Sequence, residues 1–233
     1  MSRLRTLLFW MHLATGVLVA AVVLVMSVTG VLLTYQRQVT AWADTRGLDG
    51  SAPVPGRPRL GAEALLEAVH AREGRLPTAV TWRADPDAPV QVAFGRERTL
   101  YLNAYTGATL GEGAAGTRAF FRKVTDWHRW LAAGDESRDR GKAITGAANL
   151  GFLFLVLSGL VLWFPRNLAA RAFRNVMVFR RGLPPKARDF NWHNVIGFWS
   201  LVPLFVVVLS AVVISYPWAS DLVYRAAGED PPA

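Results

Sequence analysis

The hydrophobic pattern of the chain is dominated by three long apolar runs. Residues 7–35, 143–165 and 190–220 contain no Asp, Glu, Lys or Arg. About 20 apolar residues are enough to span the hydrocarbon core of a bilayer. The runs therefore predict three transmembrane helices, at 7–35, 143–165 and 193–218, and they exclude a soluble globular protein. Because the apolar core of a signal peptide is only about 7–15 residues long, we interpret the first run as a retained anchor.

The polar stretch between the first two helices predicts a small folded module. Residues 36–61 are rich in Gly, Pro and Arg, which is typical of a linker. Residues 62–73 place apolar side chains at helical spacing. Three short strand-like runs separated by turn residues follow, at 79–83, 90–94 and 99–103. We therefore expect an α+β module over residues 62–116, with its helix first.

The distribution of charge predicts how the helices are oriented. The net charge is +9, and the loop 166–189 alone holds seven basic residues and one acidic residue. Short basic loops stay in the cytoplasm, whereas long segments cross the membrane largely regardless of their charge. Residues 1–6 and the loop are therefore expected inside, with residues 36–142 and the tail 219–233 outside. The positive charge is explained by topology and by anionic lipid, so we expect no nucleic-acid partner.

Several classes of catalytic and metal site have no support. The chain contains no Cys, which excludes disulfides, thiolate metal sites, iron–sulfur clusters and cysteine nucleophiles. It also lacks the glycine-rich phosphate loops, the zinc-protease motif and the nucleophile-elbow motif. Any redox or catalytic chemistry must therefore come from a cofactor or from less obvious residues.

An internal repeat relates the first and third helices. When His12 is aligned with His193, Gly16 falls on Gly197 at the same offset of 181 residues. Further positions match at this offset: Phe9 with Phe190, Thr29-Gly30 with Ser210-Ala211, Thr34 with Ser215 and Tyr35 with Tyr216. The second helix also ends in a related way, because the segment that begins Ser158-Gly159 resembles the one that begins Thr29-Gly30.

The repeat predicts a pair of histidines at one membrane depth. The first and third helices run in the same direction, so His12 and His193 are expected near the cytoplasmic edge on parallel helices. Gly16 and Gly197 lie one turn further on, where a missing side chain lets a flat group approach the backbone. A b-type haem held by two histidines requires this arrangement. The alternative is that the histidines are interfacial and that the glycines only allow close helix packing.

The segment 117–142 combines aromatic and basic residues. Within it, residues 117–131 are typical of an amphipathic helix at the outer membrane surface, and they include Trp127-His128-Arg129-Trp130. His128 is either a bystander in an aromatic belt or a ligand of a second, outer haem, with Arg129 or Arg122 near its propionates. His70, near the end of the module's helix, is expected to be a solvated surface residue.

These motifs together resemble the PepSY-associated transmembrane helix family. The resemblance covers nearly the whole chain. It rests on five segments: Phe9-Trp10-Met11-His12, the module ending from Tyr101 to Gly111, Trp127-His128-Arg129-Trp130-Leu131, the helix ending from Ser158 to Arg166, and Trp192-His193-Asn194-Val195-Ile196-Gly197. The family implies an α-helical protein of the bacterial inner membrane with a periplasmic PepSY module.

The siderophore reductases of that family imply a function and a cofactor. They contain b-type haems that pass electrons outward to a ferric siderophore. Carried over, His12 and His193 look like the ligands of an inner haem b, and His128 looks like one ligand of a second haem. The resemblance thus implies a haem-dependent ferric-siderophore reductase that acts in iron acquisition. Its partners would be the bilayer, the ferric siderophore and a cytoplasmic or membrane electron donor.

The chain also departs from the family pattern. The reductases have a fourth membrane helix that brings a further histidine, whereas this sequence ends at Ala233. We therefore expect either a fragment or a three-helix variant, in which His70 is the only histidine left to pair with His128. Two alternatives carry no redox chemistry: a membrane-anchored PepSY module that binds a periplasmic protein or peptide, and an accessory subunit of a transporter.

Overall fold

The computed structural model describes residues 3–95, 98–165 and 170–232. The chain divides into two compact units, one made of Met1–Gly30 with Asp126–Ala233 and the other of Val31–Thr125. Four of the predicted segments reach beyond the described residues: the N-terminus at 1–2, the α+β module at 96–97, the basic loop at 166–169, which includes Arg166, and the tail at 233.

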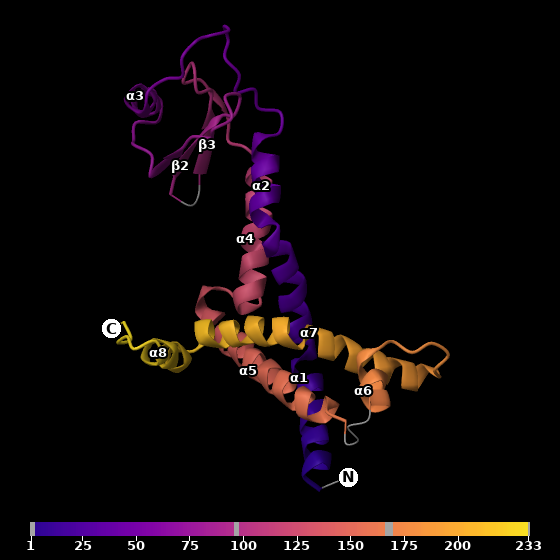
Figure 1. Cartoon of the computed structure of the whole chain (residues 1–233). Coiled ribbons are helices and arrows are strands. Elements are labelled where there is room, and N and C mark those ends of the chain that lie inside the picture. Colours follow the sequence, from indigo (N-terminus) through magenta and orange to yellow (C-terminus); the bar gives the residue numbers. More distant parts are fainter. Residues whose placement is uncertain (1–2, 96–97, 166–169, 233) are drawn as a thin grey trace. The chain divides into compact units, whose positions relative to one another are not determined.

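Three helices dominate the first unit (Figure 1). They are α1 (Arg3–Thr34), α5 (Arg138–Trp163) and α7 (Pro185–Ser215). In the described part of the chain, α1, α7 and the helical stretch Ala115–Trp163 that includes α5 are long and apolar enough to cross a membrane. None of the most apolar stretch of α1 is buried within the chain, so those side chains need lipid around them. The predicted fold class, a three-helix membrane protein with a small α+β module, is confirmed.

Helices α5 and α7 pack against each other in opposite directions. Near the end of α5, Trp163 stacks on Phe198 with ring centroids 4.6 Å apart. Near its start, Asn149 donates from Nδ2 to Ser215 Oγ at 3.2 Å, at the far end of α7. Because the start of one helix meets the end of the other at both places, the pair is antiparallel.

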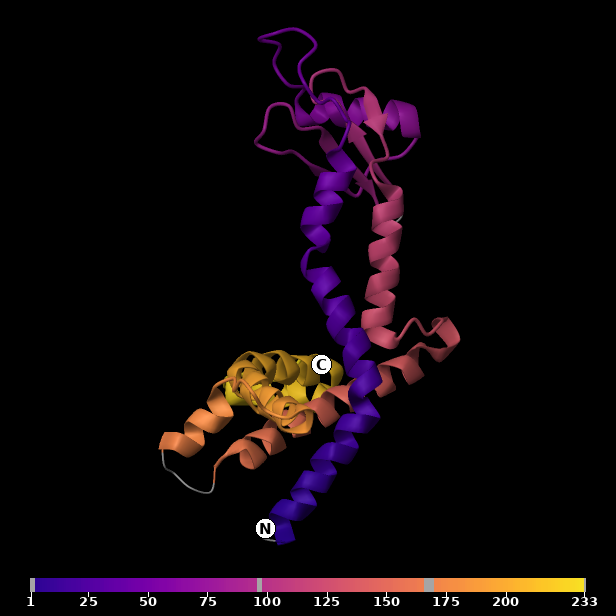
Figure 2. The ribbon, with the colours of Figure 1, turned by 90° about the vertical axis from the view of Figure 1, so that its right-hand side faces the viewer.

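Helix α1 runs along α5, also in the opposite direction. Arg5 donates to the carbonyls of Leu162 and Phe164 at the end of α5, where helix carbonyls have no partner within the helix. Further along, a Cβ atom on Gly151 would lie only 2.9 Å from Val19 Cγ1. Helix α1 therefore has the same sense as α7, although it crosses α7 (Figures 1 and 2) instead of lying parallel to it as the repeat had suggested.

Shorter helices occur in the other segments, of which only the amphipathic helix at 117–131 was predicted. The predicted linker 36–61 begins with α2 (Gln36–Thr45), because its glycines and prolines start only at Gly47. The interfacial segment contains α4 (Ala115–Trp130) and a 3-10 turn, η1 (Asp135–Ser137). The basic loop contains α6 (Ala170–Met177). Helix α8 (Pro217–Ala226) starts two residues before the predicted tail and forms its first part.

The second unit contains the predicted α+β module. Helix α3 (Ala62–Glu73) is followed by an antiparallel sheet in the order β1-β2-β3-β4. The strands are β1 (Ala79–Thr81), β2 (Val90–Phe94), β3 (Arg98–Leu102) and β4 (Thr109–Gly111). Leu65 and Val69 of α3 join Val92 and Leu100 of the sheet in one buried core. The short strand β4 was not predicted, because three residues carry too little alternation to be distinguished from a turn.

A buried carboxylate links α2 to this module. Asp44 is only 4% exposed. It accepts hydrogen bonds from the Tyr101 hydroxyl at 2.8 Å and from the Ala114 backbone N–H at 2.7 Å, and it forms an ion pair with Arg118. Burial, and then the bond to Asp44, raise the pKa of Tyr101, so that its hydroxyl remains a donor. The partners offset the cost of removing the carboxylate from water.

Candidate cofactor site

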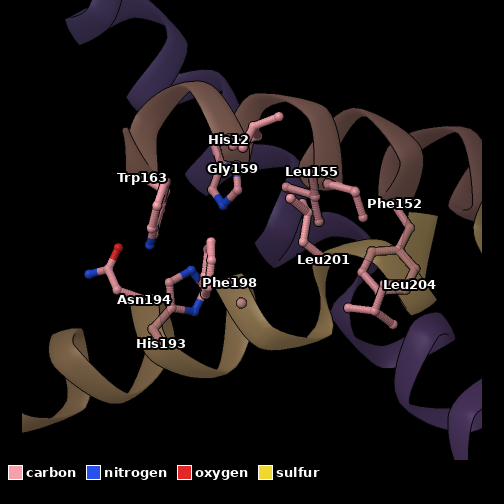
Figure 3. A pocket seen from close by; sticks show the side chains of 13 residues that line it. His12, Phe152, Leu155, Gly159, Trp163, His193, Asn194, Phe198, Leu201 and Leu204 are labelled. Atoms are coloured by element: carbon pink, nitrogen blue, oxygen red, sulfur yellow. The ribbon is translucent and has the colours of Figure 1, made fainter. Parts of the chain in front are cut away.

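The structure brings together the two histidines of the repeat. His12 of α1 and His193 of α7 point into one space from opposite sides (Figure 3). Their ring centroids lie 6.3 Å apart, and the ring planes meet at 83°. The rings are therefore opposed, with a gap between them, and are not stacked on each other.

This separation suits one metal ion between the rings. A nitrogen–metal bond of about 2 Å on each side, with about 1 Å more from each nitrogen to the centre of its ring, places trans imidazole centroids about 6 Å apart. The observed 6.3 Å agrees with that distance. The described residues contain no group of three or more His, Cys, Asp or Glu that could hold a metal ion. A haem fits this donor set, because its porphyrin ring supplies the other ligands of the iron.

The walls of the space are apolar and aromatic. Trp163 of α5 and Phe198 of α7 stack beside the two histidines. The remaining apolar lining consists of Phe152, Leu155, Val156, Leu160, Leu201 and Leu204. The cavity volume is about 180 Å³.

The glycine next to His12 differs from the one expected. A Cβ atom on Gly16 would meet Leu155 Cδ2 at 3.9 Å, so Gly16 faces α5. Gly197 borders the cavity, and a Cβ atom there would have no atom within 4 Å. Beneath the His12 ring lies Gly159 of α5, where a Cβ atom would be 3.5 Å from His12 Cε1. Side chains on a helix lean toward its N-terminus, so the His12 ring extends away from Gly16.

A serine holds the His12 ring from the same position on α5. His12 Nδ1 lies 2.9 Å from Ser158 Oγ, and Ser158 is only 4% exposed. Ser158 and Gly159 were not predicted as site residues from the sequence. The sequence feature that could have identified them is the resemblance of Ser158-Gly159 to Thr29-Gly30, which was noted in the comparison of the helices.

His128 of α4 has similar surroundings. Its Nδ1 lies 2.9 Å from Thr29 Oγ1 and 3.1 Å from the Met26 carbonyl oxygen. A Cβ atom on Gly30 would lie 3.3 Å from His128 Cε1. The ring borders a second cavity together with Met26, Arg129, Asn149, Tyr216 and other residues, none of which is a further histidine.

Arg129 and His70 were also considered for an outer site. Arg129 contacts a neighbouring tryptophan, and His70 lies in the other unit. The Arg129 guanidinium stacks over the Trp130 ring at 5.2 Å, and Arg129 borders the cavity of His128. His70 belongs to the second unit, on α3, and its side chain is exposed. The described residues therefore place two imidazoles at the cavity of His12 and His193 and one at the cavity of His128.

A family comparison covers both cavities and the module. Residues 9–233 match the family described as PepSY-associated TM region. The chain belongs to this family. No curated protein matches the sequence.

Membership in the PepSY-associated family agrees with the membrane helices and the module already described. The matched residues contain all three candidate spans from Phe9 onward, the α3–β4 module and every histidine of the chain. The protein is therefore a multi-pass membrane protein of the PepSY-associated family.

Proposed function

We propose that this PepSY-associated protein holds a b-type haem between His12 and His193 and transfers electrons across the bacterial inner membrane. The observation that carries the proposal is the opposed pair of imidazoles, with centroids 6.3 Å apart in an apolar cavity. When bound there, haem iron would supply reversible one-electron chemistry.

The residues of the chain would have three tasks at this site. His12 of α1 and His193 of α7 would hold the iron. The apolar walls would exclude water and so set the dielectric around the site. Trp163 and Phe198, already stacked on each other, would offer a flat aromatic surface beside the cofactor.

The proposed substrate is a ferric siderophore on the periplasmic side. Siderophores hold iron through hard oxygen ligands, which prefer the smaller and more highly charged Fe(III). One-electron reduction to Fe(II) would weaken that hold and release the metal. Because no bond to carbon is made or broken, the protein needs no catalytic acid or base. The electron would come from a cytoplasmic or membrane donor.

The membrane orientation belongs to the same proposal. The cluster of basic residues in 166–189 would keep that segment in the cytoplasm, and residues 36–142 would be translocated to the periplasm. In this orientation the His12–His193 cavity lies toward the cytoplasmic side and His128 toward the periplasmic side. Electrons entering at the first would leave near the second.

An absorbance measurement tests the haem proposal directly. The detergent-purified full chain is supplied with haem, and its dithionite-reduced minus oxidised spectrum is compared with the spectra of His12→Ala and His193→Ala. We expect a six-coordinate b-type spectrum in the wild type that is lost in both variants. His70→Ala is the matched control, because His70 is exposed on α3, and it should keep the spectrum.

The opposite result would identify a different class of protein. If well-folded, haem-supplied wild-type protein gives a featureless spectrum, the redox proposal is wrong. A membrane-anchored module that binds a periplasmic protein or peptide, or an accessory subunit of a transporter, would then be the better description. If the spectrum is present, reduction of a ferric siderophore is the next assay.

A further inference from the structure

Two histidine rings of this protein each contact a Ser or Thr and the Gly that follows it, which we call the hydroxyl–glycine pair. The pairs are Ser158-Gly159 beneath His12 and Thr29-Gly30 beneath His128. In each, the hydroxyl oxygen lies 2.9 Å from the histidine Nδ1. In each, a Cβ atom on the glycine would lie close to the histidine Cε1, at 3.5 and 3.3 Å. Four distances in two separate places thus repeat one arrangement.

The hydroxyl group fixes the tautomer of His12. Ser158 Oγ donates its proton to the Phe154 carbonyl, one turn back on α5, at 2.6 Å. A hydroxyl has one proton, so Ser158 can only accept from the histidine. With the hydroxyl proton on the Phe154 carbonyl, the contact with Ser158 requires the imidazole proton of His12 on Nδ1. In the neutral ring, Nε2 then keeps its lone pair, which is the form that binds a metal.

The same deduction holds for His128 and is stronger there. Thr29 Oγ1 donates to the Val25 carbonyl at 2.6 Å, so it too can only accept from the ring. The Met26 carbonyl oxygen, 3.1 Å from the same Nδ1, has no proton and can only accept a hydrogen bond. Both neighbours of Nδ1 thus require a proton on it, and Nε2 of His128 is again left with a lone pair.

The glycines explain how the rings can lie so close to a helix. At Gly159 a methyl group would be in ordinary contact with the His12 ring, whereas any longer side chain would occupy the ring's place. At Gly30 even a methyl group would be tighter than usual. Both hydroxyl groups are nearly buried, at 4% exposure for Ser158 and 9% for Thr29, so water competes little for these bonds.

We propose that Ser158 and Thr29 are positioning residues that prepare Nε2 of His12 and of His128 for binding a metal. For the inner cavity this inference rests on the proposed function, because His12 is the proposed haem ligand. For the outer cavity it goes further. His128 is held in the same way as His12, so it is a second prepared ligand and not a bystander of the aromatic belt.

The chain contains a matched control for these hydroxyl groups. Ser210 on α7 is the third member of the repeat, and it donates to the Val206 carbonyl at 2.7 Å in the same way. In place of glycine it is followed by Ala211. Within the described part of the chain, no hydrogen bond joins Ser210 to a histidine. Ser210→Ala therefore removes a hydroxyl that makes the same bond to its own helix without touching an imidazole, although Ser210 is exposed.

The first experiment reads the tautomers without any cofactor. The full chain in detergent is labelled with ¹⁵N-histidine and studied by NMR at a pH about 2 units above the ordinary histidine pKa of about 6.5. The protein has four histidines, so single His→Ala variants assign the signals. We expect His12 and His128 to be protonated on Nδ1, which is the less common form of a free imidazole.

The variants should then separate the two sites. Ser158→Ala should abolish the Nδ1–H signature of His12 and leave that of His128, and Thr29→Val should do the reverse. Ser158→Thr and Thr29→Ser should restore the signatures, and Ser210→Ala should change neither. Wild-type histidines protonated on Nε2, or signatures that survive both hydroxyl deletions, would overturn the inference. The untouched histidine in each variant reports that the chain is folded.

The second experiment uses ferric protoporphyrin IX as the probe. Loss of a bond to the second nitrogen of a ligating histidine typically lowers metal affinity about 10–100-fold, so we expect a loss of this order in Ser158→Ala. Its reduction potential should also become more positive, because the ring donates less electron density. Ser158→Thr should recover both properties.

The two experiments distinguish the inference from the proposed function. If the wild type binds no haem but shows the Nδ1–H signatures, the proposed function fails and the positioning of the rings stands. If the wild type binds haem and Ser158→Ala matches it in both affinity and potential, the role of Ser158 is refuted and the proposed function stands.

Discussion

At the scale of single residues, Asp44 is the clearest case of a side chain whose contribution to stability depends on its surroundings in the fold. It is an ordinary acidic residue in the sequence, within a segment that was predicted as a linker. In the folded unit it is 4% exposed and has three partners, Tyr101, Ala114 and Arg118. These three partners stabilise the buried carboxylate, because they replace the water that it loses on folding.

Replacing Asp44 should therefore destabilise the module strongly. Asp44→Ala leaves the Arg118 guanidinium, 18% exposed, without its carboxylate, and breaking a buried pair in this way costs about 3–5 kcal/mol. We expect faster amide hydrogen exchange across β2 and β3 of the full chain. Asp49→Ala is the control, because Asp49 is exposed and its hydrogen bonds in the described part of the chain go to the nearby Ser51. Equal exchange in the two variants would contradict this account.

Residues of the candidate site differ in how far the sequence could identify them. The sequence pointed to His12 and His193 through a shared spacing, and the structure brings their rings to a centroid distance of 6.3 Å. Ser158 was not identified as part of the site, because its contact with His12 joins residues 146 positions apart. Its hydroxyl is also indistinguishable, in a sequence, from one that merely bonds back to its own helix.

At the scale of elements, the position of α1 depends on small residues of α5. Gly151 lies where a Cβ atom would be 2.9 Å from Val19 Cγ1 and 3.4 Å from Thr15 Cγ2. Membrane helices associate through close packing of this kind, since lipid tails give no hydrophobic drive for one helix to bind another. The same contact sets the distance between α1 and α5, and hence that between His12 and Ser158.

A larger side chain at Gly151 should therefore disturb His12 from a distance. Gly151→Leu would push α1 away from α5 and lengthen the His12–Ser158 bond, two turns further along α5. We expect loss of the His12 Nδ1–H signal in the ¹⁵N spectrum and weaker haem binding. Gly16→Ala serves as the control, because its new methyl group would meet Leu155 at an ordinary 3.9 Å. A wild-type His12 signal in Gly151→Leu would show that this packing does not position the ring.

At the scale of the whole molecule, the testable property is its orientation in the membrane. The sequence contains no Cys, so single cysteines can report the side on which a segment lies. We expect Ser51→Cys, in the segment 36–142, to react with a membrane-impermeant maleimide once the outer membrane is permeabilised. Lys186→Cys, in the basic loop, should react only after the inner membrane is broken.

Both cysteine variants should label fully in broken membranes, which controls for reactivity of the site itself. Early labelling of Lys186→Cys, with protection of Ser51→Cys, would reverse the proposed orientation. The His12–His193 cavity would then lie on the periplasmic side, and the proposed direction of electron flow would be wrong.

The sequence by itself determined the membrane helices and the module. A run of apolar residues long enough to span a bilayer has few other stable solutions, because each residue contributes its own preference for lipid over water. The alternation in β2 and β3 and the helical period in α3 likewise reflect local geometry. The module's core is built from the residues that these periods place on one face.

Only the tertiary structure decided which faces of the membrane helices meet. In lipid, the outward and inward faces of a helix are both apolar, so the sequence pattern does not mark the contact surface as it does in water. The glycine that leaves room beside the His12 ring was expected to be Gly16 on the same helix, and it is Gly159 on α5. The partner of each histidine is thus a product of helix packing, and helix packing depends on contacts between residues far apart in the chain.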